Sequence, residues 1–160
     1  MSADARPIHG PEQSSPPGAP VPTHDSAAKL ADDFQQAVGE YLIRHRSVLD
    51  VLSKMQEASA RVQRAVAKAV TVCGCIRIEA SRQALSDVTS EDVSYADLKQ
   101  FVQSHVAGQL CHNCRDVIEV ELGQAYFYTT ALAETFNMRA ADVLAKEKQR
   151  LETLGVFNLT

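Results

Sequence analysis

The 160-residue chain has no apolar run near the roughly 20 residues that a membrane-spanning helix needs. Its N-terminus has neither the basic stretch nor the apolar stretch of a secretory signal, so we expect a cytoplasmic protein. Lysine and arginine are scattered and the formal net charge is -4. No broad positive surface therefore points to nucleic acid as the main partner, although a small phosphate-bearing ligand is compatible with this charge.

Strand-like alternation of apolar and polar residues is also missing, and no internal repeat is visible. Helical spacing is the pattern that remains. A chain of 160 residues, 45% of them hydrophobic, is long enough for one domain with a core and short for two. We therefore predict an all-α fold, a single helical bundle over residues 26–160.

The two ends of the chain differ from its middle. All six prolines lie within residues 1–25, and none follows Pro22. The same segment has few large apolar side chains. Such a segment cannot bury enough surface to offset its ordering entropy, which predicts a disordered tail with solvated histidines. The opposite end, residues 155–160, is apolar for a terminus, and we predict that it docks on the bundle or on a second subunit.

The strongest helical pattern follows Ser47, where apolar and small residues recur in steps of four and three. This spacing is typical of a helix packed along a partner helix. Its members are Val48, Leu52, Met55, Ser59, Val62, Val66, Ala69 and Cys73. Other patterns predict helices over 28–44, 94–108, 114–136 and from 140 to near 155, whereas residues 76–78 are too short to found a sheet.

Four cysteines form two close pairs, Cys73-Gly74-Cys75 and the C-x-x-C pair of Cys111 and Cys114. In a reducing cytosol, such pairs are metal ligands or redox thiols more often than disulfides. The first pair stands at the end of the helix from Ser47, and the second at the start of the helix over 114–136. If all four bind one ion, the two helices form a long antiparallel pair. Their predicted lengths match, at about 35 to 39 Å each for a rise of 1.5 Å per residue.

Several chemistries suit four such thiols. Tetrahedral zinc takes four thiolates, and C-x-x-C is its usual chelate spacing, although C-x-C is tighter and less standard. An iron–sulfur cluster also takes four cysteines. A redox pair is a third alternative, because the dipole at a helix N-terminus lowers the thiol pKa of Cys111 and Cys114. The four could also be unconnected small buried residues.

We favour a structural zinc ion held by Cys73, Cys75, Cys111 and Cys114. A complete set of four thiolates leaves no open position for a catalytic water, so the metal would contribute to folding stability. His112, between the cysteines of the second pair, is expected on the solvent side of the turn.

A second signal lies in residues 119–148, where an acidic, aromatic-rich helix is followed by a break at Asn137-Met138 and a final helix. This stretch resembles the second half of the MazG-like all-α nucleoside triphosphate pyrophosphohydrolases. The chain is also similar to small bacterial proteins that pair this helix with C-x-C and C-x-x-C. The resemblance implies a dimeric helical bundle in which carboxylates hold Mg²⁺ and a nucleotide is cut between its α and β phosphates.

The departures from that family fall on its metal-binding acids. Its E-x-x-D maps onto Glu121 to Gln124, so an amide replaces the aspartate. Its upstream E-x-x-E maps onto Glu57 to Ala60, which leaves one acid where two are expected. Magnesium prefers anionic oxygen ligands, and pyrophosphohydrolysis needs the cation to neutralise phosphate charge. The resemblance therefore implies an incomplete catalytic set of Glu57 and Glu121.

Two functions from different classes follow. A degenerate, non-catalytic member of the family would keep the bundle as a homodimer, use the cysteine site for stability, and bind a partner or a nucleotide. The alternative is a Mg²⁺-dependent pyrophosphohydrolase in which Glu57 and Glu121 hold the metal and Arg61 or Arg64 grips phosphates. Exposed glutamates and a basic stripe near a helix C-terminus also occur without any function. We favour the non-catalytic reading, because fold resemblance alone does not carry an activity across.

Overall fold

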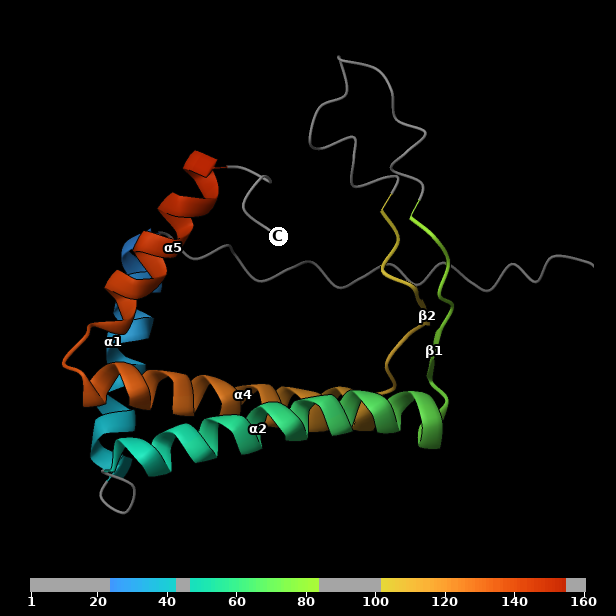
Figure 1. The fold of residues 1–160 in the computed structure, drawn as a ribbon, viewed down its shortest axis with the longest axis horizontal. Coiled ribbons are helices and arrows are strands. Elements are labelled where there is room, and N and C mark those ends of the chain that lie inside the picture. The colour runs from blue at the N-terminus through green and yellow to red at the C-terminus, as the bar shows by residue number, and fades with distance from the viewer. Residues whose placement is uncertain (1–23, 43–46, 84–101, 155–160) are drawn as a thin grey trace, which may run out of the picture.

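The computed structural model describes residues 24–42, 47–83 and 102–154. Over these ranges the chain forms four α-helices, a short π-helical segment and one antiparallel pair of strands (Figure 1). The elements are α1 (His24–Tyr41), α2 (Val48–Lys68), η2 (Ala69–Cys73), β1 (Ile76–Ile78), β2 (Val106–Gly108), α4 (His112–Thr135) and α5 (Ala140–Leu154). The predicted all-α class is confirmed. No helix within these ranges is long and apolar enough to cross a bilayer.

The long antiparallel helix pair is formed by α2, continued by η2, and α4, which lie side by side (Figure 1). The 21 residues of α2 and the five of η2 face the 24 residues of α4, so the lengths match as predicted. The buried face of α2 consists largely of alanine, with Val51, Ala58, Ala65 and then Ala69 of η2. Small side chains at these positions let the two helix axes approach closely.

The packing face of α2 is rotated from the predicted stripe. Leu52 and Val66, two members of that stripe, remain 42% and 37% exposed, whereas their neighbours Val51 and Ala65 are buried. The physical reason is that α4 packs on the alanine side, where the helices come closest, and leaves part of the larger apolar stripe beside the contact.

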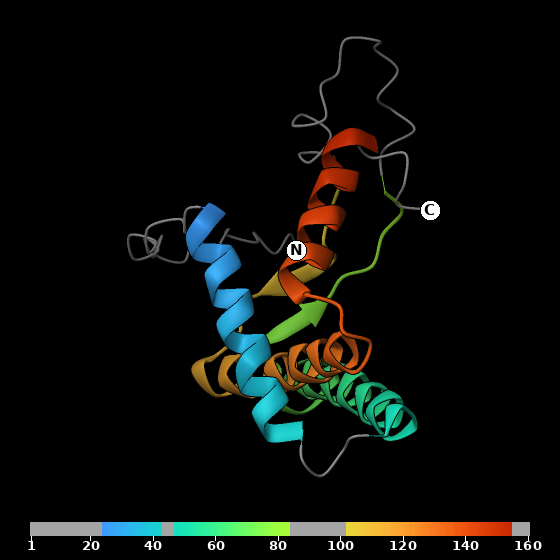
Figure 2. The same ribbon diagram turned by 90° about the vertical axis from the view of Figure 1, so that its left-hand side faces the viewer.

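The apolar core lies at one end of the helix pair, where α1 crosses it. Val38 of α1 and Leu42, directly after α1, meet Val51 of α2 and Ala131 of α4, with Phe127 and Leu132 packed against them. After α4 the chain reverses at Asn137, whose φ of 53° is left-handed, and this is the predicted break. From there α5 runs alongside α1 (Figure 2).

Polar contacts fix this corner. The side-chain oxygen of Gln35 accepts a hydrogen bond from the Ala140 N–H at 2.6 Å, which caps the start of α5. The Gln35 amide donates to Glu134 at 2.7 Å and to the Met138 carbonyl at 2.9 Å. Arg139 also forms two hydrogen bonds with Asp32, at 2.8 and 2.6 Å. One glutamine of α1 therefore joins the end of α4 to the beginning of α5.

The two strands stand at the other end of the helix pair (Figure 1). Ile76 pairs with Gly108 and Ile78 with Val106. The expectation that residues 76–78 are too short to found a sheet is thus wrong, because a distant segment supplies the partner strand. The helix predicted over 94–108 is also wrong from residue 102 onward, where the chain is extended or forms β2; residues 94–101 lie outside the described ranges.

The predicted boundaries at the ends are tested only in part. The first helix begins at His24, two residues before residue 26, where the predicted bundle starts. Residues 1–23 and the predicted docking segment 155–160 lie outside the described ranges.

Replacing Gln35 with leucine is expected to loosen α5. The variant loses three hydrogen bonds, of which each typically contributes about 0.5 to 1.5 kcal/mol. Hydrogen exchange in the first turns of α5 should accelerate and the melting temperature should fall. The matched control is Gln36→Leu, because exposed Gln36 bonds to Glu40 within its own helix. Equal effects of the two variants would contradict the role of Gln35.

Candidate metal centre

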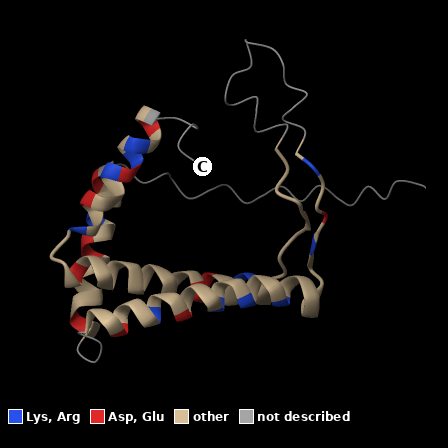
Figure 3. Cartoon of the chain, in the orientation of Figure 1, with Lys and Arg blue, Asp and Glu red and all other residues tan. Residues whose placement is uncertain are grey.

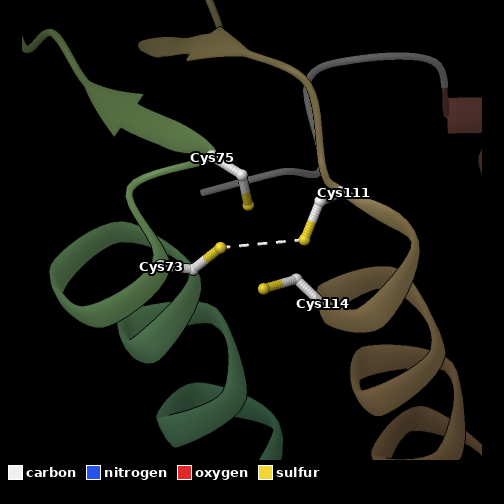
Figure 4. A group of neighbouring side chains, drawn as sticks. All are labelled: Cys73, Cys75, Cys111 and Cys114. Atoms are coloured by element: carbon white, nitrogen blue, oxygen red, sulfur yellow. Dashed lines mark hydrogen bonds between the residues drawn. The ribbon is translucent and has the colours of Figure 1, made fainter.

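The four cysteine sulfurs converge where the helix pair meets the strands (Figure 4). All four Sγ atoms lie within 4.8 Å of one another. Cys73 ends η2, Cys75 directly precedes β1, Cys111 precedes α4, and Cys114 lies in the first turn of α4. The structure thus brings together the two pairs that were predicted to meet. Such a cluster can hold a metal ion.

A π-helical turn and a glycine position the first pair. The Gly74 N–H donates to the Ala69 carbonyl at 3.0 Å, a bond that spans five residues and ends the helix. Gly74 has a φ of 72°, a left-handed conformation that glycine adopts without a Cβ penalty. This reversal brings Cys75 back beside Cys73, with its sulfur 3.8 Å from the Ala69 carbonyl oxygen.

The start of α4 positions the second pair. Cys111 is extended, with φ -67° and ψ 162°, and its carbonyl accepts from the Arg115 N–H at 3.0 Å. Cys111 and Cys114 are three residues apart, so a single helical turn places both sulfurs on one side. The first turn also leaves backbone N–H groups without partners within the helix, and these can stabilise a thiolate.

The pairing of β1 with β2 keeps the two cysteine pairs next to each other, because Cys75 directly precedes β1 and Cys111 follows β2. Gly108 lies opposite Ile76, and a Cβ atom at Gly108 would stand 2.7 Å from the Cys75 carbonyl oxygen. Real Cβ contacts of that length essentially never occur, and the φ of 90° at Gly108 also favours glycine. Sequence reasoning missed this role. The glycine three residues before Cys111 was the available signal.

The spacing of the sulfurs fits one ion. A tetrahedral ion with metal–sulfur bonds of about 2.3 Å places its sulfurs about 3.8 Å apart. The sulfurs of Cys73 and Cys111 are 3.7 Å apart, and no pair in the group exceeds 4.8 Å. A multi-iron cluster separates thiolates that bind different irons, so it needs a wider arrangement. The four thiols are free, because a disulfide requires about 2.05 Å between sulfurs.

The pKa values of the thiols are shifted in different directions. The backbone N–H of Cys114, followed by its thiol, lowers the pKa of Cys111 to about 7. The neighbouring Cys111 sulfur raises the pKa of Cys114 to about 12 and is also the largest cause of the raised pKa of Cys73. A lowered thiol pKa at the helix start is therefore right for Cys111 and wrong for Cys114. One thiolate beside protonated neighbours is the expected metal-free state, because further negative charge needs a cation.

His112 is not a member of this group. It is exposed, and its Nδ1 lies 3.0 Å from the Asp116 carboxylate one turn along α4. This placement agrees with the expected position on the solvent side of the turn.

The predicted acidic pair lies elsewhere, midway along the helix pair. Arg61 stands between the two glutamates, with Nη1 3.5 Å from Glu57 and Nε 3.1 Å from Glu121. The Nε contact is an ion pair without hydrogen-bond alignment, since this buried nitrogen has no hydrogen-bond partner. Lys54 also binds Glu57 at 2.9 Å, and this bond is the main reason that the pKa of Glu57 is lowered.

The structure places three of the predicted residues together, in ion pairs that the sequence pattern did not indicate. Glu57 and Glu121 contact the same cation, which is the side chain of Arg61. Arg64, the other predicted phosphate ligand, is exposed. From Arg61 to Cys73 the separation along the helix is about 18 Å at 1.5 Å per residue, so the acidic pair and the cysteines form two separate sites.

Substituting Gly108 by alanine is expected to disturb the cysteine group without touching a ligand. The new Cβ would clash with the Cys75 carbonyl and force the strands apart. Thermal melting should shift downward and the metal content of the purified protein should fall. Gly123→Ala is the control, because nothing lies within 4 Å of its added Cβ. In a helix interior this control is expected to stabilise by up to about 1 kcal/mol. Unchanged melting and metal content in Gly108→Ala would refute the positioning role.

Comparison with family models, with curated proteins and with solved structures gives no match to this chain.

Proposed function

We propose that the protein is a non-catalytic helical scaffold whose α2–α4 pair is clamped by one structural zinc ion, and that it acts by binding a partner. The observation that carries this proposal is the convergence of the four sulfurs within 4.8 Å at the end of the helix pair. Cys73, Cys75, Cys111 and Cys114 would be the ligands.

The donor set supports a structural ion. Thiolates are soft ligands that favour zinc or a single iron over magnesium or calcium. Zinc has no geometric preference from its d electrons and commonly takes four thiolates in closed tetrahedral sites. A closed shell leaves no position for a substrate or an activated water. The contribution of the metal is then stability.

The distribution of the core explains why such a clamp is useful. The large buried side chains of the main apolar cluster, Val38, Leu42 and Val51, all lie at the α1 end. Towards the cysteines, the buried positions of the long helix are Ala58, Ala65 and Ala69, which bury little apolar area each. Hydrophobic burial alone stabilises that end weakly. A metal ion bound by both η2 and α4 would supply the stabilisation that burial of alanine does not provide.

We predict one zinc ion per chain, and a lower melting temperature after treatment with a chelator. Each of the four Cys→Ser variants removes one thiolate ligand and should lose the metal. Stability should fall with it, because the binding free energy of a structural metal contributes to the free energy of folding. Hydrogen exchange should then rise around η2, the strands and the start of α4, and change least at the α1–α5 corner. Native mass spectrometry and metal analysis provide the measurements.

The control for the cysteine variants is Val72→Ala, which alters a 78% exposed side chain next to Cys73. It should keep the metal and the melting temperature. Protein prepared under reducing conditions that contains neither zinc nor iron would rule out the metal clamp. Iron in place of zinc would keep the clamp and correct the identity of the ion.

The alternative function, a Mg²⁺-dependent pyrophosphohydrolase, rests on the resemblance to the MazG-like family. The ion pairs of Arg61 weigh against it, because a guanidinium already occupies the space between the two carboxylates. Magnesium would have to displace that side chain before it could bind both Glu57 and Glu121. A degenerate member of that family, with its cation site closed by arginine, agrees better with this arrangement.

A screen for pyrophosphate release from the common nucleoside triphosphates, with Mg²⁺ or Mn²⁺, is expected to show no turnover. Glu57→Gln and Glu121→Gln should behave as the wild type does. Glu119→Gln, an exposed position two residues away, is the matched control. Turnover that both site variants abolish and the control retains would replace the non-catalytic proposal by the enzymatic one.

A further inference from the structure

Two sulfurs of the cysteine group face each other between the ends of the two long helices. The Sγ atoms of Cys73, which ends η2, and of Cys111, which precedes α4, are 3.7 Å apart (Figure 4). A disulfide requires about 2.05 Å between sulfurs, so these two atoms would have to approach by about 1.7 Å. The residues are 38 positions apart in the sequence. A disulfide between them would therefore join the same two elements as the proposed metal ion.

Both side chains lie where the chain leaves a helix. Cys111 is extended, and its side chain makes no capping hydrogen bond to α4. Cys73 is the last residue of η2, and Gly74 after it has a left-handed φ of 72°. Rotation about the two Cα–Cβ bonds can bring the sulfurs together without opening an interior turn of either helix.

The pairings within each cysteine pair are less suitable for such a link. Figure 4 shows a contact between Cys73 and Cys111, and none within either pair among the four side chains drawn. Only Gly74 separates Cys73 from Cys75, so their disulfide would close a very small, strained ring. A disulfide between Cys111 and Cys114 would stay within the start of α4 and leave η2 unlinked.

Cys73 is also the most accessible thiol of the group. It is exposed, whereas the other three cysteines are half-buried. Its neighbour Val72 is 78% exposed, and the side chain of His112 is 86% exposed. Reactive cysteines are partly exposed and have electropositive surroundings, whereas buried structural cysteines are inert. A small oxidant such as hydrogen peroxide can therefore reach Cys73.

The charges near the group are mainly basic. Residues 62–75 contain no acidic side chain but include Arg64 and Lys68, and Figure 3 shows basic positions along the half of α2 next to the strands. Arg115 follows the second cysteine pair directly. Asp116, the first acid of α4, contacts His112 at 3.0 Å. Oxidation by peroxide releases hydroxide, and positive surroundings stabilise such a leaving anion.

We propose that Cys73 and Cys111 form a disulfide on oxidation by peroxide, and that this disulfide releases the metal and replaces it as the link between η2 and α4. The inference rests on the proposed function, because it assigns a redox regulation to the same four ligands. Oxidation of two ligands leaves only Cys75 and Cys114 as thiols. Two thiols are too few for a closed tetrahedral site, so the metal dissociates.

The reaction balances with hydrogen peroxide as the oxidant. The sulfur of Cys73 attacks one peroxide oxygen and the O–O bond breaks, which gives a sulfenic acid on Cys73 and a hydroxide that takes a proton from solvent. The sulfur of Cys111 then attacks the sulfenic sulfur. The S–S bond forms, the S–O bond breaks, and the second hydroxide also leaves as water. Each sulfur loses one electron, and peroxide gains both.

The disulfide would preserve the helix pair when the metal leaves. The buried positions of α2 and η2 towards the cysteines are alanines, so loss of the metal alone is expected to loosen this end. A covalent bond between η2 and α4 keeps the two elements together. Reduction by an excess of a small thiol reverses the reaction and restores all four ligands. The site would thus exchange a metal link for a covalent link, according to the oxidant present.

Trypsin separates the two cysteine pairs, so the pairing can be measured directly. The first pair lies in the tryptic peptide 69–77 and the second in the peptide 100–115. Zinc-loaded protein is treated with one equivalent of hydrogen peroxide, its free thiols are blocked, and it is digested without reductant. Mass spectrometry should find the two peptides joined, with fragmentation placing the link between Cys73 and Cys111. A chromogenic zinc chelator should detect one zinc released per disulfide.

The melting temperature provides a second measurement on the same samples. A strong chelator should lower it in the reduced protein and leave it unchanged in the oxidised protein, because the disulfide has replaced the metal. Treatment with excess dithiothreitol and zinc should restore the sensitivity to the chelator.

The four Cys→Ser variants separate the proposed pair from the other two cysteines. All four are expected to lack the metal, so they are compared in the same metal-free state. Cys75→Ser and Cys114→Ser should still give the joined peptides after oxidation, whereas Cys73→Ser and Cys111→Ser should lose them. Equal yields of joined peptide in all four variants would overturn the assignment of the pair. The digest of the wild type does not depend on how well these variants fold.

Two results with the zinc-loaded wild type would overturn the inference. One is a disulfide confined to the peptide 100–115. The other is a protein that keeps its zinc and its thiols under conditions in which the same peroxide oxidises free cysteine, and this result would leave the metal clamp intact. Protein that contains no metal but forms the joined peptides would support the disulfide and overturn the clamp. The two proposals can therefore fail separately.

Discussion

The convergence of four sulfur atoms at one end of the α2–α4 pair is the constraint on which the rest of the structure depends. It brings the end of one long helix next to the start of the other, as the antiparallel direction of the pair requires. The strands follow from it, because Ile76 and Gly108 must pass close to each other directly beside the sulfurs. Glycine at residues 74 and 108 permits the reversals that this closeness requires.

The two ends of the helix pair are held by different forces. At the α1–α5 end, large apolar side chains and the hydrogen bonds of Gln35 join four helices. At the cysteine end, the contact between the long helices is made by alanine, which packs closely but buries little area. The four thiols that could hold a metal ion lie at this weakly buried end. The same alanine packing shifts α4 to one side of α2 and leaves Leu52 and Val66 partly exposed.

Glu57 and Glu121, the acids suggested by the family resemblance, differ from the cysteines because other side chains already bind them. Carboxylates that hold Mg²⁺ must be free to bind it, whereas Glu57 and Glu121 are engaged with Arg61 and Lys54. The guanidinium of Arg61 is part of the chain itself, so it neutralises the two carboxylates without any bound cation. The helix pair thus carries this ion-paired group midway along its length and the thiol cluster at its end.

The sequence by itself determined the helical class, the long antiparallel pair and the meeting of the cysteines. Those features are encoded locally, by a period of three to four residues and by cysteine pairs at the ends of two equal helices. Only the tertiary structure decided which side of α2 packs, that residues 76–78 find a partner strand, that Arg61 lies between the glutamates, and that the pKa of Cys114 is raised. Each of these features depends on contacts between residues that are distant in sequence. The distance between such residues is set by how closely the helices pack, and the periodicity along one helix does not determine that distance.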